Sequence, residues 1–403
     1  MELTIDTFKL LDLSREYGTP LYVYHAETIQ RQYQKMVQAF QNMDVKIFYA
    51  CKALTNIHVL KYIHSLGCNI DCSSSNEVLL ALKAGFTPDR ILYTSNGICF
   101  SEIEAVADTG AFVNIDSLSN LEKFGKKFGD SYPVGVRLRP NIMAGGHMKI
   151  ATGHDKSKFG IAADQLSLLK DIVNKYQIHI HTLHIHTGSD ISDAKVFMQG
   201  LEFLFEILPQ FPSVKVLDLG GGFKVPYHPS EKETDLKSLA NALEHAIKTH
   251  PATIDRSLQL WFEPGKFLVS QCGYLLTKVN VLKEQSNLTI AGVDTGLNHL
   301  IRPMMYEAYH HISNLSCAGK PEKKYMVTGN ICETDTFSEE CLLSEIQEGD
   351  ILAIHNAGAY GFEMSSSYNA RFKPAEVLVE GDTSILIRKR ENLDDLLRNQ
   401  TLA

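Results

Sequence analysis

VKIFYACKA, residues 45–53, is a run of β-branched, aromatic and small apolar residues that ends around a lysine. Such a run is typical of a buried strand. The segment NIHVLKYIHSLG (56–67) follows it with apolar residues at helical spacing. Seven further strand-like runs recur, most of them followed by a helical segment: CNIDCSSS (68–75), RILYTSN (90–96), FVNIDS (112–117), PVGVRLRP (133–140), IHTLHIHTGS (180–189), VKVLDLGGGF (214–223) and LQLWFEPGK (258–266).

Eight strand-and-helix units in series predict a (β/α)8 barrel, because parallel strands need crossover connections, which are usually helices. A doubly wound open sheet is the main alternative. The pattern changes from about residue 270, where strand-like runs come without regular helices between them and predict an antiparallel β domain. These runs are GYLLTKVNVL (273–282), LTIAGVDT (288–295), KYMVTG (324–329), DILAIHNAG (350–358), AEVLVEG (375–381) and TSILIRKR (383–390).

The sequence therefore predicts an α/β protein with three parts. Residues 1–25 form an N-terminal segment in which TPLYVYH (19–25) is expected to pair with the β domain. Residues 26–269 form the barrel, and residues 270–403 form the mainly antiparallel β domain. A length of 403 residues agrees with more than one domain.

Composition excludes several function classes. A net charge of −8 does not favour binding to nucleic acid or to an anionic membrane. No apolar stretch is long enough for a membrane span, and the start MELTIDTFKL does not resemble a signal peptide. Eight scattered cysteines without a CxxC pair indicate a reducing, cytoplasmic compartment rather than a disulfide framework or a zinc site.

Working residues of a barrel lie at the carboxyl ends of its strands, and three features stand there. Lys52 ends the first run, and a lysine beside buried residues is either a snorkelling surface residue or a functional amine. The glycines at 220–222 form either a tight turn or a phosphate cradle. Glu263 places a carboxylate after the last strand. Together they would supply an amine, a phosphate site and an acid on one face.

The segment HIHTLHIHTGSD contains His184 and His186, which share one face of a strand. This spacing suits metal ligands, ordinary core or surface histidines, or a ring that stacks on a flat cofactor. No matching ligand set stands on the other strands, so we predict no metal and favour stacking.

Six motifs occur in this order: HIHTGS, LDLGGGF, EPGK, DTGLNHLIRPMMYEAYH, GNICETDTF and NAGAYGFEMSSSYNAR. In these motifs the chain resembles the fold-type III decarboxylases that use pyridoxal 5′-phosphate (PLP), the class of alanine racemase and ornithine decarboxylase. Within that class it is similar to the diaminopimelate decarboxylases. The resemblance extends over nearly the whole chain, from FYACKA to the closing PAEVLVEGDTSILIRKRENLDDLL.

The resemblance implies a role for each matched residue. Those that hold the cofactor are the Schiff-base lysine Lys52, the stacking ring His186, the phosphate ligands Ser189, Gly221 and Gly222, the partner of the pyridine nitrogen Glu263, the turn residues Gly265 and Lys266, and Tyr360. Those that bind substrate are Lys266, Arg302, Tyr306, Glu333 and Tyr360, and Cys332 is the acid that protonates the α-carbon. Cys332 and Glu333 resemble residues that a second subunit of a homodimer inserts into the site.

The implied activity is decarboxylation of meso-diaminopimelate to lysine. In this reaction Arg302 and Lys266 would bind the distal carboxylate of the substrate, and Glu333 would bind its distal ammonium group. A decarboxylase of a polyamine precursor (ornithine, arginine or carboxynorspermidine) is the alternative within the same chemistry. Alternatives from other classes are a metal-dependent barrel hydrolase and a regulatory paralogue without catalytic activity. Lys266 stands where the family usually has arginine. Lysine keeps the positive charge but lacks the planar guanidinium that binds a carboxylate through two hydrogen bonds. Further departures are Asn330 for proline, Asn356 for aspartate and Glu363 for serine.

Overall fold

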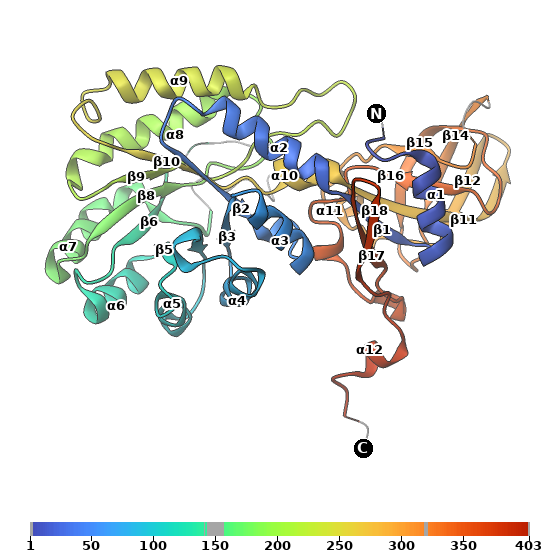
Figure 1. Ribbon diagram of the computed structural model, residues 1–403, viewed down its shortest axis with the longest axis horizontal. Coiled ribbons are helices and arrows are strands. Elements are labelled where there is room, and N and C mark those ends of the chain that lie inside the picture. The colour runs from blue at the N-terminus through green and yellow to red at the C-terminus, as the bar shows by residue number, and fades with distance from the viewer. Residues whose placement is uncertain (1–2, 141, 143–156, 318–320, 402–403) are drawn as a thin grey trace. The chain divides into compact units, whose positions relative to one another are not determined.

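The computed structural model describes residues 3–140, 142, 157–317 and 321–401 (Figure 1). The chain divides into two compact units. We call them the barrel unit, residues Gln32–Val225 and Lys232–Phe267, and the β unit, residues Met1–Arg31, Pro226–Glu231 and Leu268–Ala403.

The barrel unit contains a closed parallel sheet in which each strand pairs with the next and the last pairs with the first. The predicted (β/α)8 barrel is therefore confirmed, and the open sheet is excluded. A two-residue strand, β7 (Ile161–Ala162), adds to β6. The eight barrel strands, in order around the barrel, are β2 (Val45–Ala50), β3 (Asn69–Cys72), β4 (Ile91–Thr94), β5 (Phe112–Ile115), β6 (Val134–Arg139), β8 (Ile180–Ile185), β9 (Val216–Asp218) and β10 (Gln259–Phe262).

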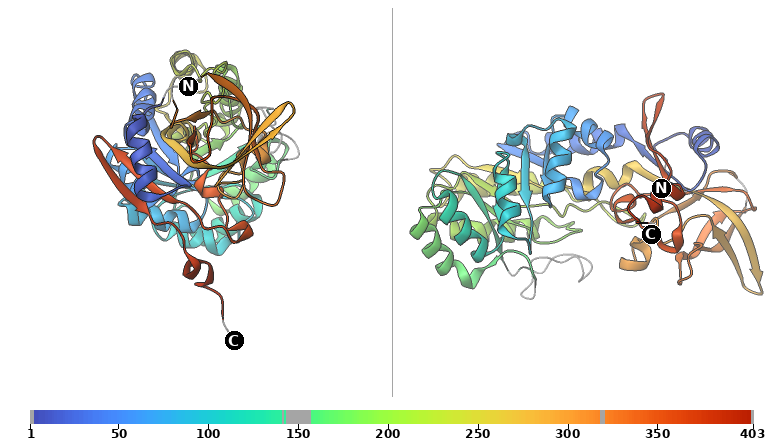
Figure 2. Two further views of the ribbon diagram at one scale, coloured as in Figure 1. Left: turned by 90° about the vertical axis from the view of Figure 1, so that its right-hand side faces the viewer. Right: turned by 90° about the horizontal axis from the view of Figure 1, so that it is seen from below.

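Helices surround these strands, as Figures 1 and 2 show. A polar residue at the turn after a strand often begins the next helix by accepting a hydrogen bond from a free backbone N–H group, as Ser74 does for α4 and Ser117 for α6. The helices between the barrel strands are α3 (Ile57–Ser65), α4 (Ser75–Ala84), α5 (Phe100–Ala107), α6 (Leu118–Phe128), α7 (Leu166–Tyr176), α8 (Ala194–Ile207) and α9 (Leu236–Thr249); α2 (Ala26–Ala39) precedes β2 and α10 (Lys266–Val269) follows β10.

The barrel strands are buried along most of their length, which explains why they read as continuous apolar runs. Phe48, Leu92, Val216 and Trp261 form a buried cluster, with the rings of Phe48 and Trp261 4.6 Å apart. This packing fixes the strands that carry the polar residues described below.

The β unit is built on one mixed sheet in the order β15-β14-β12-β11-β1-β17-β18, with β16 pairing β11 and β13. Most pairings are antiparallel, and β1–β17 and β12–β14 are parallel. Figure 2 shows the long hairpin of β11 and β12. The strands are β1 (Leu21–His25), β11 (Gly273–Gln285), β12 (Leu288–Val293), β13 (Ile312–Asn314), β14 (Glu322–Thr328), β15 (Thr336–Ser344), β16 (Ile351–Ile354), β17 (Ala375–Glu380) and β18 (Thr383–Arg388).

Strand β1 lies between β11 and β17, and residues Leu21, Tyr22, Val23 and Tyr24 are fully buried. Helix α1 (Thr7–Tyr17) packs Leu10 and Leu13 into the same core. The remaining helices of this unit are the short α11 (Arg302–Tyr306) and α12 (Leu393–Leu397). Among the described residues of both units, we find no helix long and apolar enough to cross a membrane.

Candidate active site

Lys52 lies in a single 3-10 turn, Cys51–Ala53, directly after strand β2. Its side chain is 44% exposed, and its Nζ lies 3.7 Å from Oδ2 of Asp71, whose side chain is buried at the end of the neighbouring strand β3. The register places Ala50 beside Asp71, so the pairing of β2 with β3 brings Lys52 and Asp71 together. Lys52 is therefore a half-exposed amine held over a buried carboxylate.

A row of ionisable residues crosses the barrel next to this pair. Arg137, His184 and Asp218 are register partners on β6, β8 and β9, and all three are buried. Glu263 follows β10 and is also buried. A ring nitrogen of His184 and a carboxylate oxygen from each of Asp218 and Glu263 lie within 4.8 Å of one another.

Such a triad also suits a metal ion, but the charge of Arg137 and Lys52 acts on the same histidine and glutamate, which disfavours a further cation. The expectation that no matching ligand set stands on the other strands is wrong, because Asp218 of β9 and Glu263, which follows β10, lie beside His184. We describe the cluster as a buried network of acids and bases. It holds the carboxylate of Glu263 between His184, 3.5 Å away, and Asp218.

The protonation of this network follows from burial. Burial raises the pKa of Asp218 well above its usual range, and the nearby charge of Glu263 raises it further. Burial also raises the pKa of Asp71, although the ammonium of Lys52 opposes the rise. Burial opposes ionisation of Glu263 too, but its contact with His184 and the charge of Lys52 outweigh burial and bring its pKa below the usual range. Glu263 is therefore the anion of the network.

His186 is placed after β8 by contact with the glycine turn. The backbone N–H of Gly221 donates to Nδ1 of His186 at 3.1 Å, which leaves the proton of a neutral ring on Nε2. Burial lowers the pKa of His186 to about 3, so the ring is neutral at pH 7. His186 is thus a fixed, uncharged, flat ring beside Glu263, as a stacking role requires.

The turn at residues 220–222 needs glycine at each position. Gly220 and Gly222 have φ values of +67° and +100°, which side-chain-bearing residues rarely adopt. A Cβ atom on Gly221 would collide with the carbonyl oxygen of Glu263, and one on Gly222 with that of Gly188. The turn therefore packs its backbone against the segments that carry Glu263 and Ser189.

Two buried atoms test whether these residues fit PLP. Oε1 of Glu263 and Oγ of Ser189 are both buried and form no hydrogen bond with the residues that the structure describes, although Oε1 lies 3.5 Å from Nε2 of His184. Leaving such atoms unpaired is costly, so each is available to a polar group of a ligand. A ring nitrogen at Glu263 and a phosphate at Ser189 and the glycine turn would satisfy them, and the residues therefore fit the cofactor.

Lys266 is engaged with a residue that the sequence did not indicate. Its ammonium forms an ion pair with Asp190, which directly follows Ser189 and has φ +60°. The predicted role of Lys266 toward a substrate carboxylate is untested, and any such contact would have to share the ammonium with Asp190. Gly265, beside it, packs against Ala50 and Ala53, which flank Lys52 along the chain.

The β unit gathers Arg302, Tyr306 and Tyr360 into one cluster. The guanidinium carbon of Arg302 lies 5.8 Å from the ring centre of Tyr306 and 5.9 Å from that of Tyr360. A third ring, Tyr227, is closer still at 5.4 Å. Nε of Arg302 is buried without a hydrogen-bond partner among the described residues. The cluster is a cation held between aromatic faces.

Cys332 and Glu333 belong to a second cluster of the β unit. The side chain of Asn369 accepts from the backbone N–H of Cys332 at 3.1 Å and donates to its sulfur at 3.2 Å. The hydroxyl of Tyr368 lies 3.5 Å from the sulfur and 2.8 Å from Oε1 of Glu333, and its one proton can be donated to either. These hydrogen bonds, first that of Tyr368 and then that of Asn369, lower the pKa of the exposed Cys332 thiol. The thiol is thus held in place and made more acidic.

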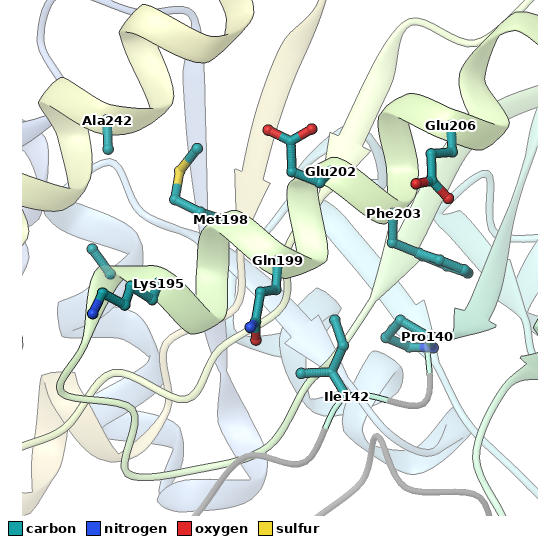
Figure 3. A pocket seen from close by; sticks show the side chains of 10 residues that line it. Pro140, Ile142, Lys195, Met198, Gln199, Glu202, Phe203, Glu206 and Ala242 are labelled. Carbon is teal, nitrogen blue, oxygen red and sulfur yellow. The ribbon is translucent and has the colours of Figure 1, made fainter.

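An open cavity of about 940 Å³ lies elsewhere, along the exposed face of α8, and Figure 3 shows its lining. Lys195, Gln199 and Glu202 of α8 line it, with Gln199 pointing toward Ile142, and Ala242 of α9 also lines it. None of the predicted site residues lines it, so it is not the active site.

Comparison with known proteins identifies related chains over nearly the whole length. Residues 26–270 match the family model described as pyridoxal-dependent decarboxylase, pyridoxal binding domain. Diaminopimelate decarboxylase of Methanothermobacter thermautotrophicus is 38% identical, over 97% of this chain and 94% of the relative. That of Aquifex aeolicus is 36% identical, over 98% and 94%.

Solved structures agree with these relatives. The crystal structure of Helicobacter pylori diaminopimelate decarboxylase in complex with L-lysine has a TM-score of 0.88 and 30% identity, covering 96% of this chain and 98% of that one. The Vibrio vulnificus lysine/ornithine decarboxylase in complex with putrescine has a TM-score of 0.82, covering 94% and 99%. At 20% identity, that second likeness shows the shared fold alone.

Proposed function

The chain belongs to the pyridoxal-dependent decarboxylases and, among them, to the diaminopimelate decarboxylase family, and on that premise we propose that it converts meso-diaminopimelate to L-lysine and carbon dioxide. The observation that carries the choice of substrate is Arg302. Its guanidinium is stabilised by three aromatic rings rather than by an acid, in the part of the chain that the structure describes. A substrate with a carboxylate far from the reacting carbon would supply the missing anion.

The cofactor would be held by residues of the barrel unit. When bound, PLP supplies the electron sink for the pair of electrons that carbon dioxide leaves on the α-carbon. Lys52 would bind the aldehyde carbon until the substrate amine replaces it. Ser189, Gly221 and Gly222 would bind the phosphate, and His186 would lie against the ring. Glu263, the anion of its network, would hold a proton at the ring nitrogen and so maintain the pull on the electrons.

The remaining chemistry is delivery of a proton to the α-carbon, and we assign it to Cys332. The thiol is exposed and made more acidic by Tyr368 and Asn369, as a proton donor at neutral pH needs to be. We propose that Cys332 and Glu333 complete the site of a second copy of the chain in a homodimer, and that the enzyme is cytoplasmic. The domain boundaries at residues 25 and 269 also stay predictions.

A substrate panel tests the proposal. Release of carbon dioxide should be fastest with meso-diaminopimelate and poor with ornithine, arginine and carboxynorspermidine, because these leave Arg302 unpaired. Arg302→Ala should raise KM for diaminopimelate about 10- to 150-fold, since a hydrogen bond to a charged group contributes about 1.5–3 kcal/mol. Arg15→Ala, which removes an exposed arginine of α1 paired with Asp12, is the matched control.

A wild-type preference for a substrate without a distal carboxylate would replace this proposal by the polyamine-precursor alternative. An unchanged KM in Arg302→Ala would leave the substrate assignment without its structural basis.

A further inference from the structure

Residues Pro226–Glu231 are a short excursion of the chain between β9 and α9 that belongs to the β unit. Three contacts anchor it there. The side-chain amide of Asn356 donates to the carbonyl oxygen of Pro226 at 3.2 Å, the ring of Tyr227 meets that of His310 edge-on at 5.2 Å, and the ring of His228 meets Tyr309 at 4.8 Å. The excursion is therefore built into this unit rather than looped into solvent.

The excursion also closes on itself. The carboxylate of Glu231 accepts the backbone N–H groups of Tyr227, at 2.9 Å, and His228, at 3.1 Å. Asn356 has φ +55°, a conformation that asparagine tolerates better than most residues, so the donor that holds Pro226 is itself in a defined position. The backbone of Tyr227 is thus fixed from both sides.

This position brings the side chain of Tyr227 to Arg302. Tyr227 is 7% exposed, and its ring centre, at 5.4 Å, is nearer to the guanidinium carbon than those of Tyr306 and Tyr360. A guanidinium over an aromatic face gains electrostatic attraction without giving up its N–H donors to an acid. Three rings can therefore keep the cation in one place while its donors stay available.

We propose that Tyr227 is a positioning residue that holds the guanidinium of Arg302 ready to bind the distal carboxylate of the substrate. The inference rests on the proposed function and adds a residue to it. Tyr306 and Tyr360 belong to the family motifs quoted in the sequence analysis, as Arg302 does. Tyr227 lies in a segment that contains none of these motifs. Its contribution is to the binding of one functional group, so it should affect ligands with that carboxylate and spare those without it.

L-Lysine and cadaverine provide the test, because they are the same diamine chain with and without a carboxylate. Each is measured as a competitive inhibitor of diaminopimelate decarboxylation by the complete enzyme. In Tyr227→Leu, we expect the inhibition constant of L-lysine and the KM for diaminopimelate to rise about 2- to 30-fold, which corresponds to the ~0.5–2 kcal/mol of a cation–π contact. The inhibition constant of cadaverine should stay within error. Tyr227→Phe keeps the ring face and should cause a smaller rise than Tyr227→Leu.

Tyr176→Leu is the matched control, since it removes a cation–π contact with Lys175, 4.9 Å away, on the outer helix α7. Circular dichroism checks folding, and Tyr227→Met replaces the leucine variant if that variant does not fold. Equal weakening of L-lysine and cadaverine, or no weakening of either, would overturn the inference while decarboxylation of diaminopimelate by the wild type still stands. Absence of that wild-type activity would instead overturn the proposed function and this inference with it.

Discussion

The change Asp218→Asn tests the buried acid network, and we expect it to alter how protein stability depends on pH. Asp218 is fully buried, and Glu263 is 7% exposed. A carboxylate oxygen of Glu263 lies within 4.8 Å of one of Asp218. Two carboxylates at that separation repel by about 3.5 kcal/mol at an effective dielectric constant of ~20. That repulsion and the loss of hydration together favour one proton on the pair in the folded protein.

The sign of the effect follows from the raised pKa of Asp218. An aspartate of the unfolded chain has a pKa of about 3.9, so above that pH the folded protein keeps a proton that the unfolded chain releases. The stability contributed by this group is complete below about pH 4 and is lost as pH rises toward the pKa of the folded state. The loss amounts to about 1.4 kcal/mol per pH unit.

Asparagine removes this titration and still offers an oxygen to the N–H of Gly220, which donates to Asp218 at 2.9 Å. Between pH 5 and pH 7 the free energy of unfolding of the variant should therefore rise relative to that of wild type, at every pH below the raised pKa of Asp218 in the folded protein. Urea unfolding of cofactor-free protein, followed by circular dichroism at several pH values, measures the difference. Infrared spectroscopy should show a weaker carbonyl band of protonated carboxyl groups in the variant than in wild type. Asp382→Asn, at an exposed turn, is the control. Parallel stability curves for variant and wild type would show that the pair holds no extra proton and would refute the reasoning.

Three further predictions concern the proposed roles. Borohydride reduction of the PLP-loaded enzyme followed by peptide mapping should place the pyridoxyl group on Lys52, and a label on another lysine would remove that assignment. Glu263→Gln should retain PLP but lose roughly 10²-fold in decarboxylation rate, because one electrostatic contact to the ring is lost; near-normal turnover would contradict its role. Mixing inactive Lys52→Ala and Cys332→Ala subunits in equal amounts should restore about a quarter of wild-type activity if a two-fold dimer shares its sites. No recovery despite proven subunit exchange would place both residues in one chain's site.

The sequence predicted the barrel because its strands are buried on both faces and read as uninterrupted apolar runs. It did not predict β15, whose sequence TFSEECLLS mixes charged and apolar residues. That strand lies at the end of the sheet with much of its length exposed, where no apolar alternation is required. The three-residue strand β13 is too short to show a period.

The site was predicted only where a strand end or a family motif marked it. Asp71, Arg137 and Asp218 were missed although each interrupts an apolar run, in NIDC, VGVRLR and VLD, and an ionisable residue within a buried strand is a usable signal. Their meeting could not be predicted, because the register between strands far apart in sequence is set when the barrel closes. The pairing of Lys266 with Asp190 and the contact of Tyr227 with Arg302 also join segments that are far apart in sequence.

The position of β1 between β11 and β17 has a consequence for synthesis on the ribosome. Its four fully buried residues emerge first, whereas β11 begins only at Gly273 and β17 only at Ala375. About 250 residues separate β1 from β11, which at ~5–20 residues per second is about 12–50 s of translation. During that interval, an apolar strand of the nascent chain has neither of its neighbours. Strand β1 can therefore be paired on both sides only after β17 has been synthesised, and its apolar residues lack one of these neighbours until then.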